Sequence, residues 1–256
     1  MKIDLFKIGS LTVHGYGFMI GVGFILAMLL AEYRAKKLGL REESVIDITI
    51  IAGLSGFLGA KLLYVIVEFD AFVKNPKAVL GSAGFVVYGG IIAGVLCCIL
   101  YCKIKKLNLL EYFDLVMPEI AFAQGFGRIG CFLAGCCYGR ETNAWYGITF
   151  HNSPFAPNEV ALIPTQLISS VADFAHFFIL IFLAKRVKHK GVVTAMYLIF
   201  YSVGRFLIEM LRNDPRGTIS VMSTSQFISI FTLAAGIFMF VFCRRKRQGE
   251  EKQEAQ

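Results

Sequence analysis

Residues 45–67 read VIDITIIAGLSGFLGAKLLYVIV, and only Asp47 and Lys61 in this stretch are charged. About 20 mainly apolar residues are enough for a helix to cross the ~30 Å hydrocarbon core of a bilayer. The stretch therefore predicts a transmembrane helix.

Six further hydrophobic segments of comparable length lie on either side of it. They cover Tyr16–Glu32, Phe85–Cys102, Tyr112–Tyr138, Gln166–Ala184, Val192–Leu211 and Ser225–Cys243. The whole chain of 256 residues is 56% apolar and 17% charged, whereas soluble domains average ~45–50% and ~25%. We therefore predict an all-α polytopic membrane protein with about seven transmembrane helices, and not a disordered chain or a small disulfide scaffold.

The net charge of +8 is distributed unevenly along the chain. Sixteen basic residues follow the first, third, fifth and seventh segments, Lys188 among them, and seven lie in the alternate connections, including Lys2 and Arg216. The positive-inside rule then predicts the N-terminus outside and the C-terminus in the cytoplasm. Since the basic residues are explained as topology signals, the charge does not indicate a nucleic-acid partner.

No internal repeat is apparent, so we expect one transmembrane domain over residues 1–243. The longest external connection, about 139–165, predicts a small external cap over the bundle. The alternating pattern in Trp145–Phe150 favours a short strand or hairpin arm within it. Residues 244–256 predict a polar cytoplasmic tail.

Arg128, Arg205 and Glu209 lie within or at the edge of hydrophobic segments, where charges are costly and often functional. Arg205 and Glu209 are four residues apart on a predicted helix and can pair. That pair is either a structural bridge or part of a cationic pocket for a phosphate, because guanidinium groups can fork onto phosphate oxygens. Five glycines between Gly125 and Gly139 allow close backbone approach near Arg128.

The run from Gly127 to Arg140 reads GRIGCFLAGCCYGR, and five other short motifs accompany it. They are Tyr16-Gly17, Lys61 with Tyr64, Tyr88-Gly89-Gly90, Pro164-Thr165-Gln166, and Arg205 with Glu209. With these motifs in this order, the chain resembles the prolipoprotein diacylglyceryl transferase family over nearly its whole length.

The chain departs from the family pattern at three positions. Tyr88 stands where the family has a His, Cys131 where it has an Asn, and Cys136 where it has a Glu. The His is often given a general-base role, and a tyrosine hydroxyl gives up its proton less readily than histidine. The resemblance therefore supports the fold and a lipid-phosphate site more firmly than the exact chemistry.

The resemblance implies an enzyme that transfers the diacylglyceryl group of phosphatidylglycerol to the lipobox cysteine thiol in the signal peptide of a prolipoprotein. A thioether forms and glycerol 1-phosphate leaves. The implied location is the bacterial cytoplasmic (inner) membrane, as a multi-pass protein. No cofactor and no metal are expected.

We assign site roles on this basis. Arg128 and Arg205 hold the phosphate, Glu209 orients Arg205, and Tyr88 accepts or relays the thiol proton. Further substrate-binding positions are Tyr16, Lys61, Gly89, Gly90, Gly130, Gly139 and Gln166. The roles of Cys131, Cys136 and His14 are left open, since His14 can touch the head group or only lie at the membrane interface.

The other cysteines and histidines have simpler interpretations. Cys97, Cys98, Cys102 and Cys243 lie in apolar segments and are expected in the core. A metal site at Cys131, Cys136 and Cys137 would need more ligands, and His151 is the only nearby histidine. Asp173 and His176 share a helix face, which predicts a buried hydrogen-bonded pair.

Three alternatives stay open at this point. The three departures are compatible with a paralogue of the same fold that uses another lipid or acceptor. A non-catalytic lipid-binding or transport protein would also suit an arginine at membrane depth. A thiol redox role for Cys131, Cys136 and Cys137 is the third.

Overall fold

The computed structural model describes residues 4–9, 11–82, 84–187, 189–215, 218–219 and 222–254. Its elements, in chain order, are β1 (Asp4–Ile8), β2 (Leu11–His14), α1 (Gly15–Leu38), α2 (Glu42–Val67), α3 (Phe69–Lys74), α4 (Pro76–Gly81), α5 (Val87–Ile104), α6 (Leu109–Ala134), β3 (Ile148–Thr149), β4 (Ala161–Leu162), α7 (Thr165–Arg186), α8 (Val192–Glu209), β5 (Thr218–Ile219), β6 (Met222–Ser223) and α9 (Thr224–Glu254). The strands form three antiparallel pairs of neighbours in sequence, β1 with β2, β3 with β4 and β5 with β6.

Six helices are long and apolar enough to cross a membrane, and they confirm an all-α polytopic membrane protein. They are α1, α2, α5, α7, α8 and the part of α9 up to Arg245. The other predicted segment corresponds to α6, which is 26 residues long and continues through Pro118. α6 carries Glu119, Gln124 and Arg128 and is not among the six, so a total of seven spans stays a prediction.

The orientation of the spans also stays a prediction. It rests on the distribution of basic residues, of which Lys2, Lys188 and Arg216 lie outside the described residues. The tail expected over 244–256 is part of α9 up to Glu254.

The contacts divide the chain into two compact units, residues 1–30 with 113–256, and residues 31–112. The prediction of one transmembrane domain over 1–243 is not tested by this division. We call these parts unit 1 and unit 2 and describe each by itself.

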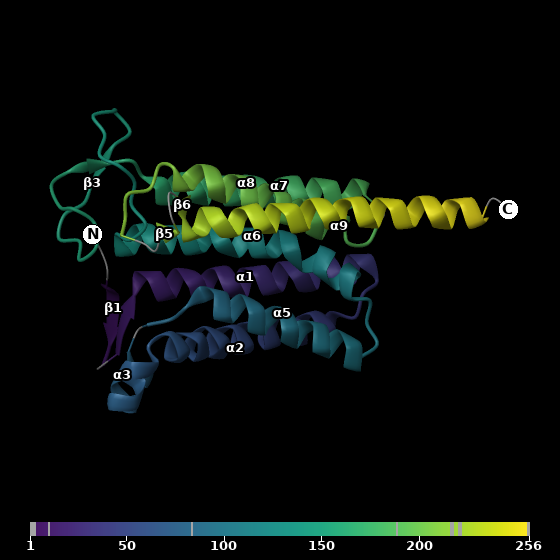
Figure 1. The fold of residues 1–256 in the computed structure, drawn as a ribbon, viewed down its shortest axis with the longest axis horizontal. Helices are drawn as coiled ribbons and strands as arrows, with labels where there is room; N and C mark the ends of the chain where they lie inside the picture. The colour runs from purple at the N-terminus through teal and green to yellow at the C-terminus, as the bar shows by residue number, and fades with distance from the viewer. Residues whose placement is uncertain are drawn as a thin grey trace. The chain divides into compact units, whose positions relative to one another are not determined.

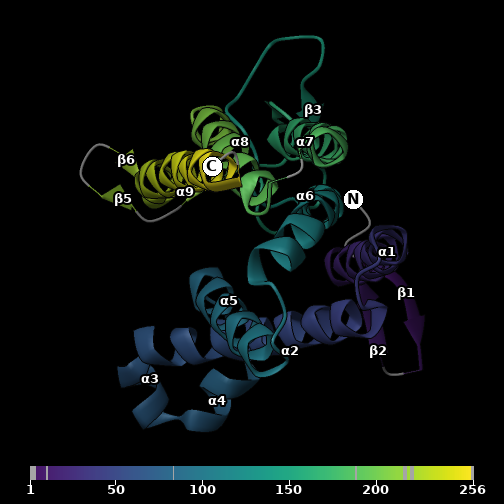
Figure 2. The ribbon, with the colours of Figure 1, turned by 90° about the vertical axis from the view of Figure 1, so that its right-hand side faces the viewer.

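Unit 1 is built around α6, α7, α8 and α9, which run side by side (Figures 1 and 2). Its core joins Ala121 of α6 with Phe177 and Leu180 of α7 and with Val193 and Tyr197 of α8. These side chains remove apolar surface from contact with the surroundings and close-pack three helices against one another.

Asp114 on α6 fixes the start of α8. Its carboxylate accepts hydrogen bonds from the backbone N–H groups of Gly191 (2.6 Å) and Thr194 (2.7 Å) and from the Thr194 hydroxyl (2.6 Å). The first N–H groups of a helix have no partner within the helix and favour a negative charge. Asp114 therefore caps α8 from a neighbouring helix and sets its position against α6.

Glycines let α1 approach α6 closely within unit 1. A Cβ atom on Gly23 would lie 2.7 Å from the Cβ of Phe126, and one on Gly130 would lie 3.1 Å from the carbonyl oxygen of Tyr16. Small residues at helix contacts permit this kind of backbone approach in membrane proteins. Gly130 thus has a packing role at the position where α1 begins.

The connection 139–165 folds as a small cap at the end of unit 1 where β3 lies (Figure 1). The pairing of Ile148–Thr149 with Ala161–Leu162 confirms the strand predicted within Trp145–Phe150. Phe150, Ala156 and Leu162 of the cap pack with Tyr138, so the cap has an apolar core of its own.

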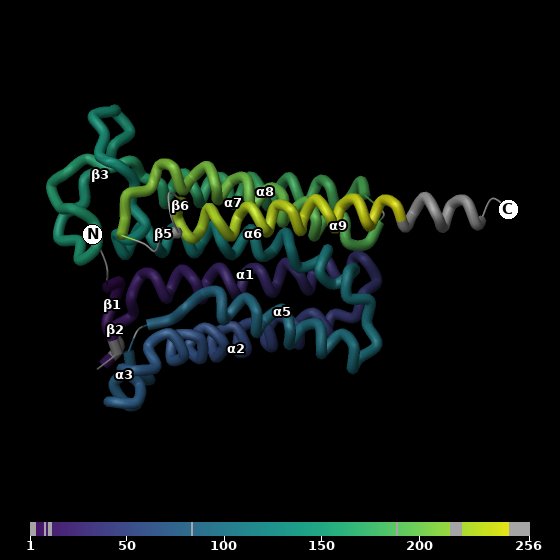
Figure 3. The backbone as a smooth tube through the Cα atoms, viewed as in Figure 1, coloured from purple at the N-terminus to yellow at the C-terminus, as the bar shows by residue number. Residues whose placement is uncertain are grey.

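In unit 2, α2 and α5 pack side by side, with α3 at the end of α2 (Figure 3). A Cβ on Gly59 would lie 2.6 Å from the Gly89 carbonyl oxygen, and a Cβ on Gly90 would lie 2.6 Å from the Gly56 carbonyl oxygen. The pair of helices therefore depends on glycine at these positions. Leu54, Leu58 and Leu62 lie exposed along α2, as expected of a lipid-facing surface.

The Gly23 contact generates a stability prediction. In Gly23→Ala the new methyl group must displace α1 from α6, and overpacking typically costs roughly 1–3 kcal/mol. We expect a lower melting temperature of the detergent-solubilised protein, measured by intrinsic fluorescence. Gly21→Ala is the matched control, because a Cβ there meets nothing within 4 Å and alanine favours the helix. Equal melting temperatures of the two variants would contradict the contact.

Candidate phosphate site in unit 1

A buried carboxylate organises two arginines at the end of α8. Glu209 Oε2 lies 3.1 Å from Arg205 Nη2 and 3.8 Å from Arg212 Nη1, and the Glu209 side chain is only 1% exposed. The four-residue spacing that predicted the Arg205–Glu209 pair is confirmed. Glu209 thus holds Arg205 in place, as the sequence led us to expect.

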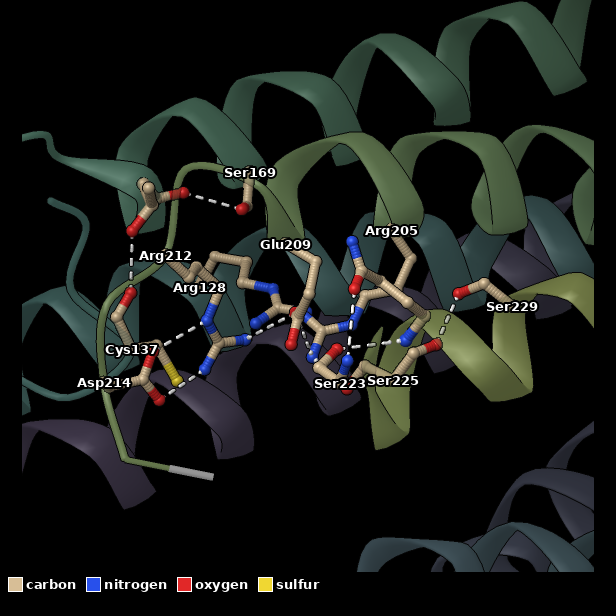
Figure 4. A network of polar contacts seen from close by, with 12 residues as sticks. Arg128, Cys137, Ser169, Arg205, Glu209, Arg212, Asp214, Ser223, Ser225 and Ser229 are labelled. Atoms are coloured by element: carbon tan, nitrogen blue, oxygen red, sulfur yellow. Dashed lines mark hydrogen bonds and ion pairs between the residues drawn. The ribbon is translucent and has the colours of Figure 1, made fainter. Parts of the chain in front are cut away.

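Arg212 is fixed a second time by Asp214. Its Nε donates to Asp214 Oδ1 at 2.9 Å and its Nη2 donates to Asp214 Oδ2 at 2.7 Å, which makes the interaction bidentate (Figure 4). Burial by itself would lower the pKa of Arg212, but the bonds and charges from Asp214 and Glu209 raise it above its usual value. Arg212 is therefore charged and occupied, and it acts as a brace for Glu209.

Arg205 reaches from α8 to the first turn of α9. Its Nη2 donates to the Ser225 hydroxyl at 2.8 Å, and Figure 4 shows the two side chains meeting. Among the described residues, its Nη1 is buried without a hydrogen-bond partner. A guanidinium carries five donors, so Arg205 keeps donor capacity for an anion.

Arg128 comes from α6 and faces α7. Its Nε lies 3.8 Å from Asp173 Oδ2, a distance for charge pairing and not for a hydrogen bond. The expected Asp173–His176 pair is wrong, since Asp173 turns to Arg128 and the His176 ring stacks on Tyr197 at 5.2 Å. Arg128 therefore also keeps donors that its carboxylate partner does not use.

A groove between α6, α7 and α8 brings Arg128 and Arg205 together. Its volume is about 470 Å³ and both arginines line it. Apolar side chains form much of the rest of its wall. They are Ile168, Ala172, Ala175, Ile179, Phe200, Leu207, Ile208 and Leu211. The groove thus combines cationic donors with an apolar trough, which suits a molecule with a phosphate and an acyl chain.

Gln166 and Thr165, both buried at the start of α7, hold the chain that follows α6. Gln166 Nε2 donates to the Cys136 carbonyl oxygen at 2.8 Å, and Thr165 Oγ1 donates to the Cys137 carbonyl oxygen at 2.7 Å. Gln166 Oε1 is buried without a hydrogen-bond partner among the described residues. Gln166 is therefore a scaffold residue with one acceptor left over.

The structure brings together three cysteines that the sequence left unassigned. The sulfur atoms of Cys131, Cys136 and Cys137 all lie within 4.8 Å of one another. Cys131 is buried, and Cys136 and Cys137 are partly buried. Tyr16 of α1 lies within electrostatic range of these cysteines and of Arg128, so it belongs to the same region.

Two other predicted positions in unit 1 have clear structural roles. Gly139 pairs with Arg212 in a β-bridge, and a Cβ on it would lie 2.5 Å from the Ile163 carbonyl oxygen. His14 lies in β2 and its Nδ1 is 2.7 Å from Asp4 Oδ1 of β1. Gly139 fastens the cap to the Arg212 loop, and His14 fastens the N-terminal hairpin.

Lys61, Tyr88, Gly89 and Gly90 belong to unit 2. Lys61 Nζ donates to the carbonyl oxygens of Ser82 (2.7 Å) and Gly84 (3.2 Å), so it anchors the loop before α5. Tyr88 lies in the first turn of α5 and is 37% exposed. Its side chain is accessible, whereas Gly89 and Gly90 are used in the α2–α5 contact.

Asp173 and Asp214 pair with Arg128 and Arg212, and sequence reasoning placed neither of them at the candidate site. Asp214 follows Arg212 by only two residues, and an acidic residue so close to an arginine is a usable signal. Asp173 is paired with Arg128 from another helix, and no sequence spacing indicates that contact.

A family model described as prolipoprotein diacylglyceryl transferase matches residues 4–242. The chain is 47% identical over 250 residues to the phosphatidylglycerol–prolipoprotein diacylglyceryl transferase of Clostridium tetani (strain Massachusetts / E88), covering 97% of this chain and 100% of that protein. It is also 47% identical over 257 residues to phosphatidylglycerol–prolipoprotein diacylglyceryl transferase 2 of Clostridium perfringens (strain 13 / Type A), covering 98% of this chain and 100% of that protein. A relative from Finegoldia magna (strain ATCC 29328 / DSM 20472 / WAL 2508) is 36% identical, covering 91% and 92%.

The buried carboxylate generates a second stability prediction. Glu209→Gln leaves Arg205 and Arg212 without their shared negative charge, and removal of one partner of a buried ion pair costs roughly 3–5 kcal/mol. We expect a clearly lower melting temperature in detergent. Glu159→Gln is the control, because Glu159 and its partner His151 are both exposed and surface pairs contribute little. If Glu209→Gln has the same melting temperature as the wild type, the buried bridge is not a structural requirement.

Proposed function

The chain belongs to the prolipoprotein diacylglyceryl transferase family, and we propose that it transfers the diacylglyceryl group of phosphatidylglycerol to a cysteine thiol of a prolipoprotein. The acceptor cysteine is that of a lipobox in the signal peptide. The protein acts as a multi-pass enzyme of the bacterial cytoplasmic membrane. Its N-terminus and its cap, about residues 139–165, face outward, and residues 244–256 face the cytoplasm.

One observation carries the proposal, namely that the groove holds two arginines and is otherwise largely apolar. Phosphatidylglycerol has the matching chemistry, a single phosphate joined to hydrocarbon chains. Arg128 is paired with Asp173, which also lines the groove, and Arg205 is paired with Glu209, and neither pairing uses all the donors of its guanidinium. Such preorganised donors stabilise charge that develops on a leaving group without reorganisation at the moment of reaction.

The reaction forms one bond and breaks one. The acceptor thiol reacts as a thiolate. Its sulfur attacks the carbon of the diacylglyceryl group that is bonded to a phosphate oxygen. A carbon–sulfur bond forms, the carbon–oxygen bond breaks, and glycerol 1-phosphate leaves with the electron pair. Arg128 and Arg205 hold the growing negative charge on the phosphate, and Glu209 keeps Arg205 aligned.

Other residues are assigned to substrate binding and proton transfer. Gln166 Oε1, which lacks a partner among the described residues, is suited to accept a hydrogen bond from a glycerol hydroxyl. The exposed Tyr16 donates to the head group. Tyr88 relays the thiol proton, and Lys61, Gly89 and Gly90 shape the surroundings of Tyr88. Gly130 contributes by permitting close contact with Tyr16, and Gly139 by its bridge to Arg212.

A direct assay tests the reaction. The purified protein in phosphatidylglycerol vesicles should release glycerol phosphate and add a diacylglyceryl group to a peptide bearing a lipobox cysteine. Turnover with another lipid or another acceptor, and none with these two, would favour the paralogue. Binding of the lipid without turnover on any acceptor would favour a lipid-binding protein.

Charge removal at the groove should slow transfer strongly. Arg128→Gln and Arg205→Gln each remove donors to the leaving group, and loss of one such group typically costs about 100- to 1,000-fold in rate. The measurement is the initial rate of peptide lipidation by equal amounts of membrane-inserted protein. Arg140→Gln is the control, since Arg140 lies exposed in the cap. Normal rates for both groove variants would rule out this placement of the phosphate.

Filling the apolar part of the groove should weaken lipid binding. Gly204 lines the groove, and a Cβ on it meets nothing within 4 Å, so Gly204→Leu occupies groove volume without a clash. We expect a raised KM for phosphatidylglycerol with an unchanged melting temperature. Gly21→Leu is the control at an equally open glycine outside the groove. An unchanged KM would mean that the lipid does not enter between α7 and α8.

A further inference from the structure

The cluster of Cys131, Cys136 and Cys137 is a feature that the phosphate site does not use. All three are free thiols, and their sulfur atoms lie within 4.8 Å of one another. Cys131 is in the last turns of α6, and the other two follow directly after Gly135. A single buried cysteine usually acts as a small hydrophobic residue. Three thiols that converge in a partly buried region are not explained by that role.

The backbone is shaped to bring these sulfurs together. Gly135 has φ of 77° and reverses the chain after α6, while Cys137 has φ of 60°, a conformation that side chains other than glycine rarely adopt. The hydrogen bonds from Gln166 and Thr165 to the carbonyl oxygens of Cys136 and Cys137 hold this conformation. Strained backbone persists where the surroundings over-determine it, and it occurs often at ligand sites.

A disulfide is a poor explanation of the cluster. Cys136 and Cys137 are adjacent, and the geometry of a disulfide bond is hard to meet between neighbours. A bridge between any two of the three would also leave the third thiol unexplained. Because all three sulfurs lie within 4.8 Å of one another, a single ligand can contact the three of them at once.

A thiophilic metal ion meets that requirement. Zinc bonds to cysteine sulfur at about 2.3 Å in tetrahedral geometry, which places the sulfurs about 3.8 Å apart. Closing the observed separations to that value takes at most about 1 Å, a shift within reach of side-chain rotation. Three protein ligands with an open fourth position are the arrangement of catalytic zinc, whereas structural zinc has four.

The charges around the cluster also fit. Three thiolates and Zn²⁺ carry a formal charge of −1, and Arg128 and Arg212 both lie within electrostatic range of Cys137. Figure 4 shows Cys137 beside Arg212 and Asp214, at one end of the row of arginines. A cationic environment favours the deprotonated thiols that metal binding requires.

We propose that Cys131, Cys136 and Cys137 bind a thiophilic divalent cation, zinc above all, whose fourth position accepts the thiol of the incoming acceptor peptide. This inference rests on the proposed transferase function and deepens it. It supplies a way to activate the acceptor thiol in a chain that has Tyr88 where the family resemblance implies a histidine base.

The step balances without a further co-reactant. The acceptor thiol binds the ion as thiolate, because coordination to the metal deprotonates a thiol. Its proton passes to water, so with the metal bound this step does not need the Tyr88 relay. The bound sulfur then attacks the glycerol carbon, the carbon–oxygen bond to phosphate breaks, and glycerol 1-phosphate leaves. The product is a neutral thioether, a weaker ligand than a thiolate, so it leaves the ion and frees the fourth position.

Metal binding is tested first, independently of activity. The purified full-length protein is loaded with zinc, desalted and analysed by elemental mass spectrometry, and we expect about one zinc ion per chain for one three-cysteine site. Cys131→Ser, Cys136→Ser and Cys137→Ser should each lose the ion. Cys97→Ser is the control, because Cys97 lies in α5 outside the cluster. A wild-type protein that retains no zinc overturns the proposal, whether its three thiols stay free or two of them form a disulfide.

The open position is tested with cobalt in place of zinc. Wild-type protein should show thiolate-to-cobalt charge-transfer absorption, and an acceptor peptide should increase it, while the same peptide with its cysteine changed to serine should not. Absorption unaffected by the cysteine peptide overturns the assignment of the fourth ligand.

Turnover separates this inference from the proposed function. Lipidation should stop when a chelator removes the metal and return when zinc is added back. Full turnover by the metal-free protein overturns the inference and leaves the proposed function standing. Suppose that the cobalt-loaded protein takes up the peptide but the zinc-loaded protein never transfers a diacylglyceryl group. This outcome contradicts the proposed function and supports the metal site alone.

Discussion

The structure of unit 1 depends on the need to neutralise guanidinium groups among apolar helices. A charge in such surroundings is costly unless it is paired and hydrogen-bonded. Glu209 meets this need for Arg205 and Arg212 together, Asp214 completes the pairing of Arg212, and Asp173 faces Arg128. The Arg128–Asp173 pair connects α6 with α7, and the other pairs fix the end of α8 and the loop that follows it. Arg128 and Arg205 both line the groove.

The same arrangement explains how the site can bind an anion while the protein stays folded. The carboxylates contact only part of each guanidinium, and Arg205 keeps a buried nitrogen without a partner among the described residues. A phosphate can therefore add to the site without breaking the ion pairs that hold the helices. The apolar wall formed by residues such as Ile179 and Phe200 gives the acyl chain a surface next to the phosphate.

The sequence predicted the parts of this account that depend on local spacing or composition. Helical hydrophobic segments, the Arg205–Glu209 pair and the strand within Trp145–Phe150 follow from periodicity, and the structure confirms them. Contacts between helices could not be predicted, because a single sequence carries no signal for the approach of Asp173 to Arg128. The convergence of Cys131 with its two neighbours along the loop likewise depends on a backbone reversal that residue types alone do not reveal.

We propose that one groove holds both the phosphate and the acyl chain of the donor lipid. The most direct test is an experimental structure of the protein with phosphatidylglycerol bound. We expect phosphate oxygens within hydrogen-bond distance of both Arg128 and Arg205, with an acyl chain along α7 and α8. A lipid phosphate bound away from these arginines, or a groove filled only by hydrocarbon, would contradict it.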